Sequence, residues 1–258
     1  MDAVARLRDH MRFLKLYRML DALDSQLAEA EKHNLPAVKI MERLFSLETA
    51  SLAQRRIERR IRESKLDERK ILDDFDFQFQ PGIDKTQIMA LAQLDFVERK
   101  QWLILAGNSG VGKSHIAKAL LLNCCKQMYI CRYTTASDML RALMSGLADD
   151  TLESKLKRYV RPQVLLIDEI GFDRLEQEAS AHASLFFKVI EGRYGKNTTI
   201  LTTNIDFETL GDYLGDPIVT ASLVDRMVHH AIIINIDGPS YRMHESHKLN
   251  RSAEGREK

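Results

Sequence analysis

The sequence contains no apolar run of about 18 residues, the length that a membrane-spanning helix needs. Its first 20 residues are amphipathic and include acids, without the apolar centre and small-residue cleavage site of a secretory signal. The three cysteines, Cys124, Cys125 and Cys131, are an odd number and form no C-x-x-C pair, which argues against a disulfide framework or a zinc site. These absences predict a cytoplasmic protein with no membrane partner.

The chain also lacks an excess of charge of either sign. Lysine and arginine number 38 against 37 aspartates and glutamates, so the formal charge of the 258 residues is +1. This argues against a basic coat that binds nucleic acid over the whole surface. The charge is unevenly distributed, however: residues 1–70 hold 16 basic and 12 acidic residues, a net charge of +4.

Residues 1–70 are predicted to be a helical domain. Leu14, Tyr17, Leu20, Leu23 and Leu27 recur at helical spacing, as does Leu16, and the His33–Pro36 segment should end that helix. A second helix is expected after Pro36. Its expected buried positions are apolar: Val38, Met41, Leu44, Phe45, Ile57 and Ile61.

Five arginines lie within eight residues of this second helix. They are Arg55, Arg56, Arg59, Arg60 and Arg62. One interpretation is a solvated helix face, supported by a Glu58–Arg62 pair at i,i+4. The other is contact with DNA phosphates, because each guanidinium can bind two oxygens.

A connector at 71–100 precedes a change of pattern. Five short apolar strands, at 102–106, 129–134, 163–168, 198–203 and 231–236, alternate with helical segments. Strands of this kind are buried on both faces, so the pattern predicts an α/β domain over 101–248 with a five-stranded, mostly parallel sheet flanked by helices. The polar tail at 249–258 is expected to be disordered.

The strongest motif is G-x-x-x-x-G-K-S, which follows the first strand and opens a helix. It comprises Gly107, Asn108, Ser109, Gly110, Val111, Gly112, Lys113 and Ser114. In such a phosphate loop the backbone N–H groups surround the phosphates, the lysine contacts the outer phosphates, and the serine hydroxyl is a Mg²⁺ ligand. The motif predicts a nucleoside triphosphate site.

The third strand, VLLIDE, supplies the acids that such a site needs. Asp168 stands at the carboxyl end of the strand, where it can hold Mg²⁺, and Glu169 is placed to polarise an attacking water. Asn204, at the end of the next strand, fits orienting that water. A GTPase would need an N-K-x-D motif, which is absent, and a small-molecule kinase would not need Glu169. Hydrolysis is therefore favoured.

Two later arginines are further candidates. Arg226, in the segment ASLVDRMV, is either paired with Asp225 or offered as an arginine finger to a neighbouring subunit's nucleotide. Arg242 is a weaker candidate for a second arginine on the bound phosphates.

The segments GNSGVGKS, VLLIDEIG, TTN and ASLVDRM resemble the AAA+ ATPases of the initiator and helicase-loader branch. They are closer still to the IstB-like helper ATPases of bacterial insertion sequences, which the arginine-rich start and the connector FDFQFQPGID also resemble. The resemblance implies ATP rather than GTP, a P-loop (AAA+) sheet, Asp168 and Glu169 as the Walker B pair, Asn204 as sensor 1, and Arg226 as the finger acting in trans within a homo-oligomer. It points to the 75–84 connector for the adenine.

The resemblance also implies the biological role: binding duplex DNA without strong sequence preference, hydrolysing ATP, and regulating target selection and activation of a cognate transposase. A replicative helicase loader and a structural DNA-bending scaffold are the alternatives. The segment 136–159 is long enough for two helices, and in initiator-type ATPases this region faces DNA. Basic residues in or next to it, Lys155, Lys157, Arg158 and Arg161, are second-rank candidates for DNA contact. The short sequence after Ile236 leaves little room for a helical lid, which puts a sensor role for Arg242 in doubt.

Overall fold

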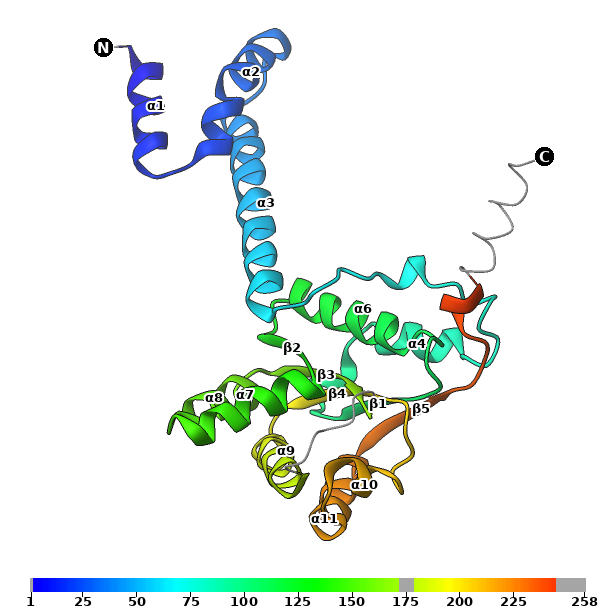
Figure 1. Cartoon of the computed structure of the whole chain (residues 1–258). Coiled ribbons are helices and arrows are strands. Elements are labelled where there is room, and N and C mark those ends of the chain that lie inside the picture. Colours follow the sequence, from blue (N-terminus) through cyan, green and yellow to red (C-terminus); the bar gives the residue numbers. More distant parts are fainter. Residues whose placement is uncertain (1, 172–178, 245–258) are drawn as a thin grey trace, which may run out of the picture. The chain divides into compact units, whose positions relative to one another are not determined.

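The computed structural model describes residues 2–171 and 179–244, with only the backbone of residues 179 and 180. The chain divides into two compact units, Met1–Arg59 and Arg60–Lys258, each with its own fold (Figure 1). The predicted tail at 249–258 and the predicted domain end at 248 lie outside the described residues. Within the described ranges, no helix is both long and apolar enough to cross a membrane.

The first unit is built from α1 (Ala3–Phe13), α2 (Tyr17–His33) and most of α3 (Ala37–Ser64). Its core contains Met11, Met19, Leu23 and Leu44. The expected single helix up to His33 is wrong in one respect, because Lys15 has a φ of 58° and separates α1 from α2. The expected end is right: Asn34 caps α2 in the left-handed conformation, ahead of Pro36.

The buried face of α3 differs from the expected one. Leu44 and Ile61 are buried, but Val38, Met41 and Phe45 are exposed. The reason lies in the helix period, since Ile40, Leu44 and Glu48 share the face that meets the first two helices. Val38, Met41 and Phe45 lie on the next stripe. Leu14 and Tyr17 are also exposed, because they flank the unexpected turn at Lys15.

The second unit contains the predicted sheet. Its strands are β1 (Trp102–Gly107), β2 (Cys131–Thr135), β3 (Val164–Ile170), β4 (Thr198–Thr203) and β5 (Ala231–Ile236). All neighbouring strands are parallel, in the order β2-β3-β4-β1-β5. The prediction of a five-stranded parallel α/β sheet is confirmed.

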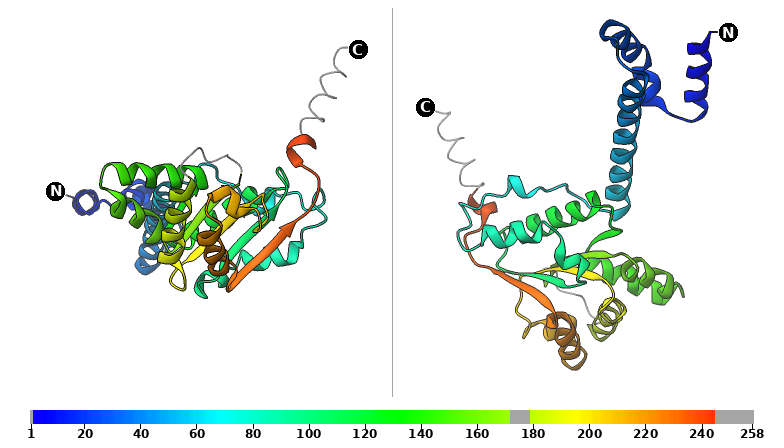
Figure 2. Two further views of the ribbon diagram at one scale, coloured as in Figure 1. Left: turned by 60° about the horizontal axis from the view of Figure 1, so that its bottom comes forward. Right: turned by 180° about the vertical axis from the view of Figure 1, so that it is seen from behind.

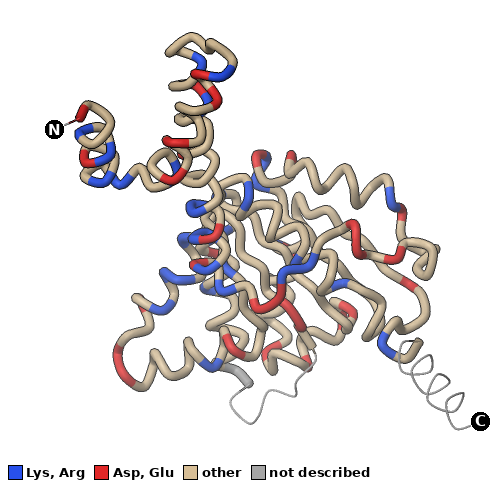
Figure 3. Tube along the Cα trace, turned by 90° about the horizontal axis from the view of Figure 1, so that it is seen from above, with Lys and Arg blue, Asp and Glu red and all other residues tan. Residues whose placement is uncertain are grey.

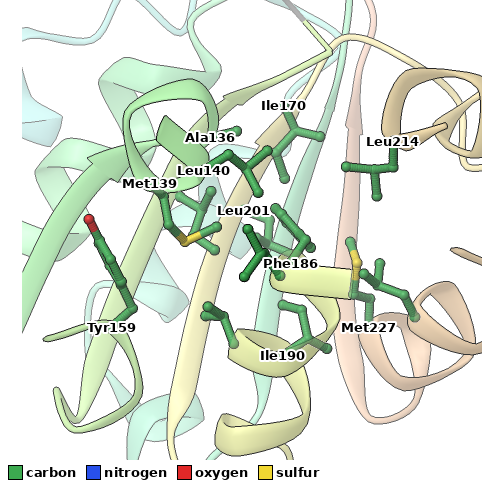
Figure 4. Close-up of a cluster of buried hydrophobic side chains, with 14 of the residues drawn as sticks. Ala136, Met139, Leu140, Tyr159, Ile170, Phe186, Ile190, Leu201, Leu214 and Met227 are labelled. Atoms are coloured by element: carbon green, nitrogen blue, oxygen red, sulfur yellow. The ribbon is translucent and has the colours of Figure 1, made fainter. Parts of the chain in front are cut away.

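Helices cover both faces of this sheet (Figures 1 and 2). They are η1 (Leu72–Asp74), α4 (Lys85–Leu91), α5 (Asp95–Glu98), α6 (Lys113–Lys126), α7 (Ala136–Ala148), α8 (Leu152–Val160), α9 (Ala179–Arg193), α10 (Leu210–Leu214) and α11 (Pro217–Val228). The expected pair of helices in 136–159 is present as α7 and α8. On the opposite face from α6, Phe186 packs with Leu201, Ile190 and Met227 in the main core (Figure 4).

Candidate functional site

The phosphate loop joins β1 to α6 at the carboxyl edge of the sheet. Gly107 has a φ of 140°, and a Cβ there would collide with the backbone oxygen of Ile236. Gly112 has a φ of 101°, and a Cβ there would lie 2.5 Å from the Phe75 ring. Both positions therefore require glycine, because an L side chain would be strained and would also clash.

Lys113 begins α6, and its ammonium group lies on the loop itself. Nζ donates hydrogen bonds to the backbone oxygens of Gly107 and Asn108, both at 2.7 Å. Burial lowers the pKa of Lys113, Asp168 opposes that shift, and Arg242 adds to it. The two hydrogen bonds hold the ammonium group where the loop would surround a phosphate.

Three side chains from different elements converge beside Lys113. Ser114 Oγ donates to Asp168 Oδ1 at 2.8 Å, and Thr202 Oγ1 donates to the same oxygen at 2.5 Å. Asp168 is only 1% exposed, which fixes its carboxylate toward these hydroxyls. The group offers the carboxylate and hydroxyl oxygens that Mg²⁺ prefers, so the predicted metal pair of Ser114 and Asp168 is brought together.

A β-bulge makes the side chains of Asp168 and Glu169 point in different directions. The register between β3 and β4 shifts between Ile167 and Ile170, and Glu169 has a φ of 63°. Its backbone N–H donates to Thr202 Oγ1 at 2.9 Å, while its side chain is exposed. Asp168 therefore buries its carboxylate, whereas Glu169, the next residue, presents its own carboxylate to the site.

These groups surround a hollow of about 510 Å³. Its lining includes residues 109–115 of the loop and α6, Glu169, residues 202–204 of β4 and the turn after it, and Arg242. Asn204 and Arg242 thus lie at the site that the sequence assigned to them. The volume lies within the range typical of pockets for nucleotide-sized ligands.

The connector before β1 forms a further wall, which the reasoning from the motifs alone did not assign. Phe75 and Gln80 line the hollow, and Gln80 Nε2 donates to the backbone oxygen of Pro239 at 2.6 Å. The backbone N–H of Tyr241 donates to Gly110 at 2.9 Å, so the segment after β5 also touches the loop. In the sequence, the aromatic residues of the connector are the signal that could have indicated this wall.

Arg226 does not line this hollow. Its Nε donates to Glu191 Oε2 at 2.6 Å, and its Nη1 donates to the Ser222 backbone oxygen at 3.0 Å. Its guanidinium also lies 4.9 Å from the Phe187 ring centre. The structure thus places Arg226 against α9, through Glu191 and Phe187, rather than at the phosphate loop of its own chain.

The first-rank candidate DNA-binding arginines all lie on α3, and the boundary in the chain between the two units falls after Arg59. Arg55 in the first unit pairs with the buried Glu48 at 3.0 Å, and Arg60 in the second pairs with Glu63 at 3.6 Å. The side chains of Arg56, Arg59 and Arg62 are exposed. Basic and acidic positions are both scattered over the described chain, and neither sign covers all of it (Figure 3). Arg55 keeps 52% of its side chain exposed despite its pair with Glu48, so it also lies at the surface.

The second-rank candidates on α8 differ in exposure. Lys155 donates to Ser145 Oγ at 2.8 Å and to Asp149 at 2.9 Å, and only 15% of its side chain is exposed. Lys157 pairs with Glu153 at 3.5 Å. Arg158 and Arg161 are exposed. Lys155 thus has a local role in joining α7 to α8, whereas Arg158 faces solvent.

Comparison with known proteins gives a family for this architecture. The model of the IstB-like ATP binding proteins matches residues 10–249. An ATP-binding protein of insertion sequence IS232 from Bacillus thuringiensis subsp. berliner is 34% identical over 94% of this chain and 96% of its own length. An ATP-binding protein of insertion sequence IS5376 from Geobacillus stearothermophilus is 35% identical over 93% of this chain and 94% of its own length.

Solved structures show the same fold at lower identity. DnaI has a TM-score of 0.53 at 22% identity, covering 67% of this chain and 90% of its own. The replication initiator DnaA, bound to AMPPCP and single-stranded DNA, has a TM-score of 0.53 at 19% identity, covering 68% of this chain and 52% of its own. These likenesses show that about two thirds of this chain shares its fold with DnaI and DnaA.

Proposed function

Because the chain belongs to the family of IstB-like ATP-binding proteins, we propose that it is a Mg²⁺-dependent ATPase that assembles on duplex DNA with little sequence preference and regulates a transposase. The insertion-sequence relatives favour this role over that of a helicase loader. The observation that carries the hydrolytic part is the arrangement at the end of β3, where Asp168 is buried and Glu169 is exposed to the site.

Each side chain has a separate task in hydrolysis. The loop N–H groups and Lys113 bind the β- and γ-phosphates of ATP. Ser114 and Asp168 would hold Mg²⁺, which neutralises charge on the phosphates when it is bound. Glu169 accepts a proton from the attacking water, and Asn204 orients that water. The Thr202 hydroxyl binds both the Asp168 carboxylate and the Glu169 backbone N–H, and so fixes the different orientations of these two residues.

Arg226 completes the site from a neighbouring subunit in this proposal. It lies outside the hollow of its own chain, so it reaches a phosphate only across an interface between copies. A guanidinium supplied in this way stabilises the charge of the transition state. ATP turnover then depends on assembly.

The DNA-binding part relies on α3 and its exposed arginines. Arg56, Arg59 and Arg62 offer paired donors to phosphate oxygens and no base-reading pattern, which fits binding with little sequence preference. Transposase regulation is inferred from the insertion-sequence relatives.

The experiment that tests this proposal is the substitution Glu169→Gln. Gln keeps the size and loses the base, so ATP turnover should fall about 100-fold or more while ATP binding is retained and the complexes on duplex DNA persist longer. The matched control is Glu153→Gln, whose side chain is 88% exposed on α8. Turnover of the Glu169 variant at the parental rate would contradict the assignment of the base.

A further inference from the structure

A second hollow lies at the opposite edge of the sheet from the phosphate loop. Its volume is about 470 Å³, and it is formed where β1 and β5 begin and α9 ends. Its lining consists of residues 99–102, Tyr194, Gly195, His229 and His230. The nucleotide site has no residue in common with it.

Among the residues that the structure describes, the lining of this hollow is rich in hydrogen-bond donors and contains no carboxylate. Arg99 and Lys100 bring two full positive charges, both on exposed side chains, and His229 and His230 add two imidazoles. Glu98, the acid next to Arg99 in sequence, is not among the lining residues. The hollow is therefore complementary to an anion.

Local backbone conformation and side-chain contacts shape this hollow. Lys100, two residues before β1, and His230, directly before β5, both adopt left-handed backbone conformations, with φ of 56° and 63°. Tyr194 Oη and His229 Nδ1 share a hydrogen bond of 2.5 Å, and the two imidazole rings have centroids 3.8 Å apart. Tyr194, His229 and His230 thus form one connected wall of the hollow rather than independent surface side chains.

We propose that this hollow binds phosphate groups of a nucleic-acid backbone, as a second contact of the ATPase unit with DNA. A phosphodiester presents only acceptor oxygens, which match guanidinium, ammonium and imidazole donors. An acidic peptide would also bring backbone N–H groups, and among the described lining residues Gln101 is the one amide side chain that can accept from them. The inference rests on the proposed DNA binding and adds a contact site to it.

The test compares duplex-DNA binding of the full chain with ATP across a range of salt concentrations. The variant carries Arg99→Gln, Lys100→Asn and His230→Asn, since asparagine tolerates the left-handed backbone at the last two positions. Affinity should fall about tenfold at 0.1 M salt, and the log–log salt slope should become shallower by about 2, because each phosphate contact contributes about −0.9. ATP binding should be unchanged.

A matched control removes two exposed cations elsewhere, with Lys85→Gln on α4 and Lys188→Gln on α9. Lysine acetylation read by mass spectrometry gives a second readout, in which DNA should protect Lys100 but not Lys188. An unchanged slope, an equal loss in the control, or Lys100 that stays reactive on DNA would overturn the second site alone. Protection of Lys100 by an acidic protein but not by DNA would also overturn it. Absence of DNA binding by the parental chain would overturn the proposed function together with this inference.

Discussion

At the scale of single residues, Thr202 connects the two acids of the site. Its hydroxyl donates to Asp168 and accepts from the Glu169 backbone, so one side chain stabilises both the strand end and the bulge. A threonine within a buried strand is otherwise an ordinary β-former. Its importance for the site follows only from the register between β3 and β4.

Thr202→Val should preserve shape and remove both hydrogen bonds. Hydrogen bonds to charged groups contribute about 1.5–3 kcal/mol, so ATP turnover should fall about 10-fold or more as Asp168 and Glu169 lose their alignment. Nucleotide binding, measured by fluorescence titration, should change little because the phosphate loop is intact. Thr198→Val, at the start of the same strand, is the matched control. Equal turnover in the two variants would contradict the role of Thr202.

At the scale of elements, the first unit depends on one buried acid. Glu48 of α3 is 2% exposed and accepts hydrogen bonds from the backbone N–H groups of Arg18 and Met19, at the start of α2. It also pairs with Arg55. A side chain of α3 therefore caps the amino terminus of α2, which carries no cap of its own.

Glu48→Ala should destabilise the first unit by about 2–4 kcal/mol, because it leaves buried N–H groups without an acceptor. Thermal unfolding followed by circular dichroism would measure the change. Glu42→Ala on the exposed face of α3 is the control and should have little effect, since its partner Lys39 is also exposed. The same unfolding midpoint in both variants would show that the cap does not stabilise α2.

Motifs and strand patterns were sufficient to predict the sheet and the phosphate site. The G-x-x-x-x-G-K-S loop, the apolar strand before Asp168 and the position of Asn204 depend on local sequence, and the structure brings them together at one edge. The family resemblance had pointed to the connector, but the lining role of Gln80 could not be read from sequence. That role depends on a contact with Pro239, 159 residues away.

Other features are not predictable from local sequence because tertiary contacts decide them. Arg193 ends α9 and looks like an exposed C-terminal charge, yet it is fully buried. It donates to Thr199 Oγ1 at 2.9 Å and to the Tyr159 backbone oxygen at 2.7 Å, and burial lowers its pKa to about 9. Likewise, the helical period of α3 fits two neighbouring stripes, and packing with the first helices selects the one that contains Leu44.

At the scale of the whole molecule, a charge near zero is compatible with DNA binding that is confined to particular faces. The first 70 residues carry a net charge of +4 within a chain of net charge +1. A single chain with few phosphate contacts binds DNA weakly at physiological salt, and several chains in one assembly multiply those contacts. In the proposed function, assembly would therefore serve both a stable grip on DNA and a complete ATPase site.

Mixing two inactive variants tests that dependence directly. Lys113→Ala removes the phosphate-binding ammonium and leaves Arg226 intact, whereas Arg226→Ala leaves the phosphate loop intact and removes the finger. Each variant alone should have little ATP turnover. In an equal mixture, random head-to-tail assembly pairs an intact loop with an intact finger at about a quarter of the interfaces, so activity should reappear in that proportion. Recovery should require duplex DNA and rise with protein concentration, both measured by phosphate release. A mixture as inactive as its components would argue against a finger supplied in trans, because subunits that exchange freely must form the mixed interface.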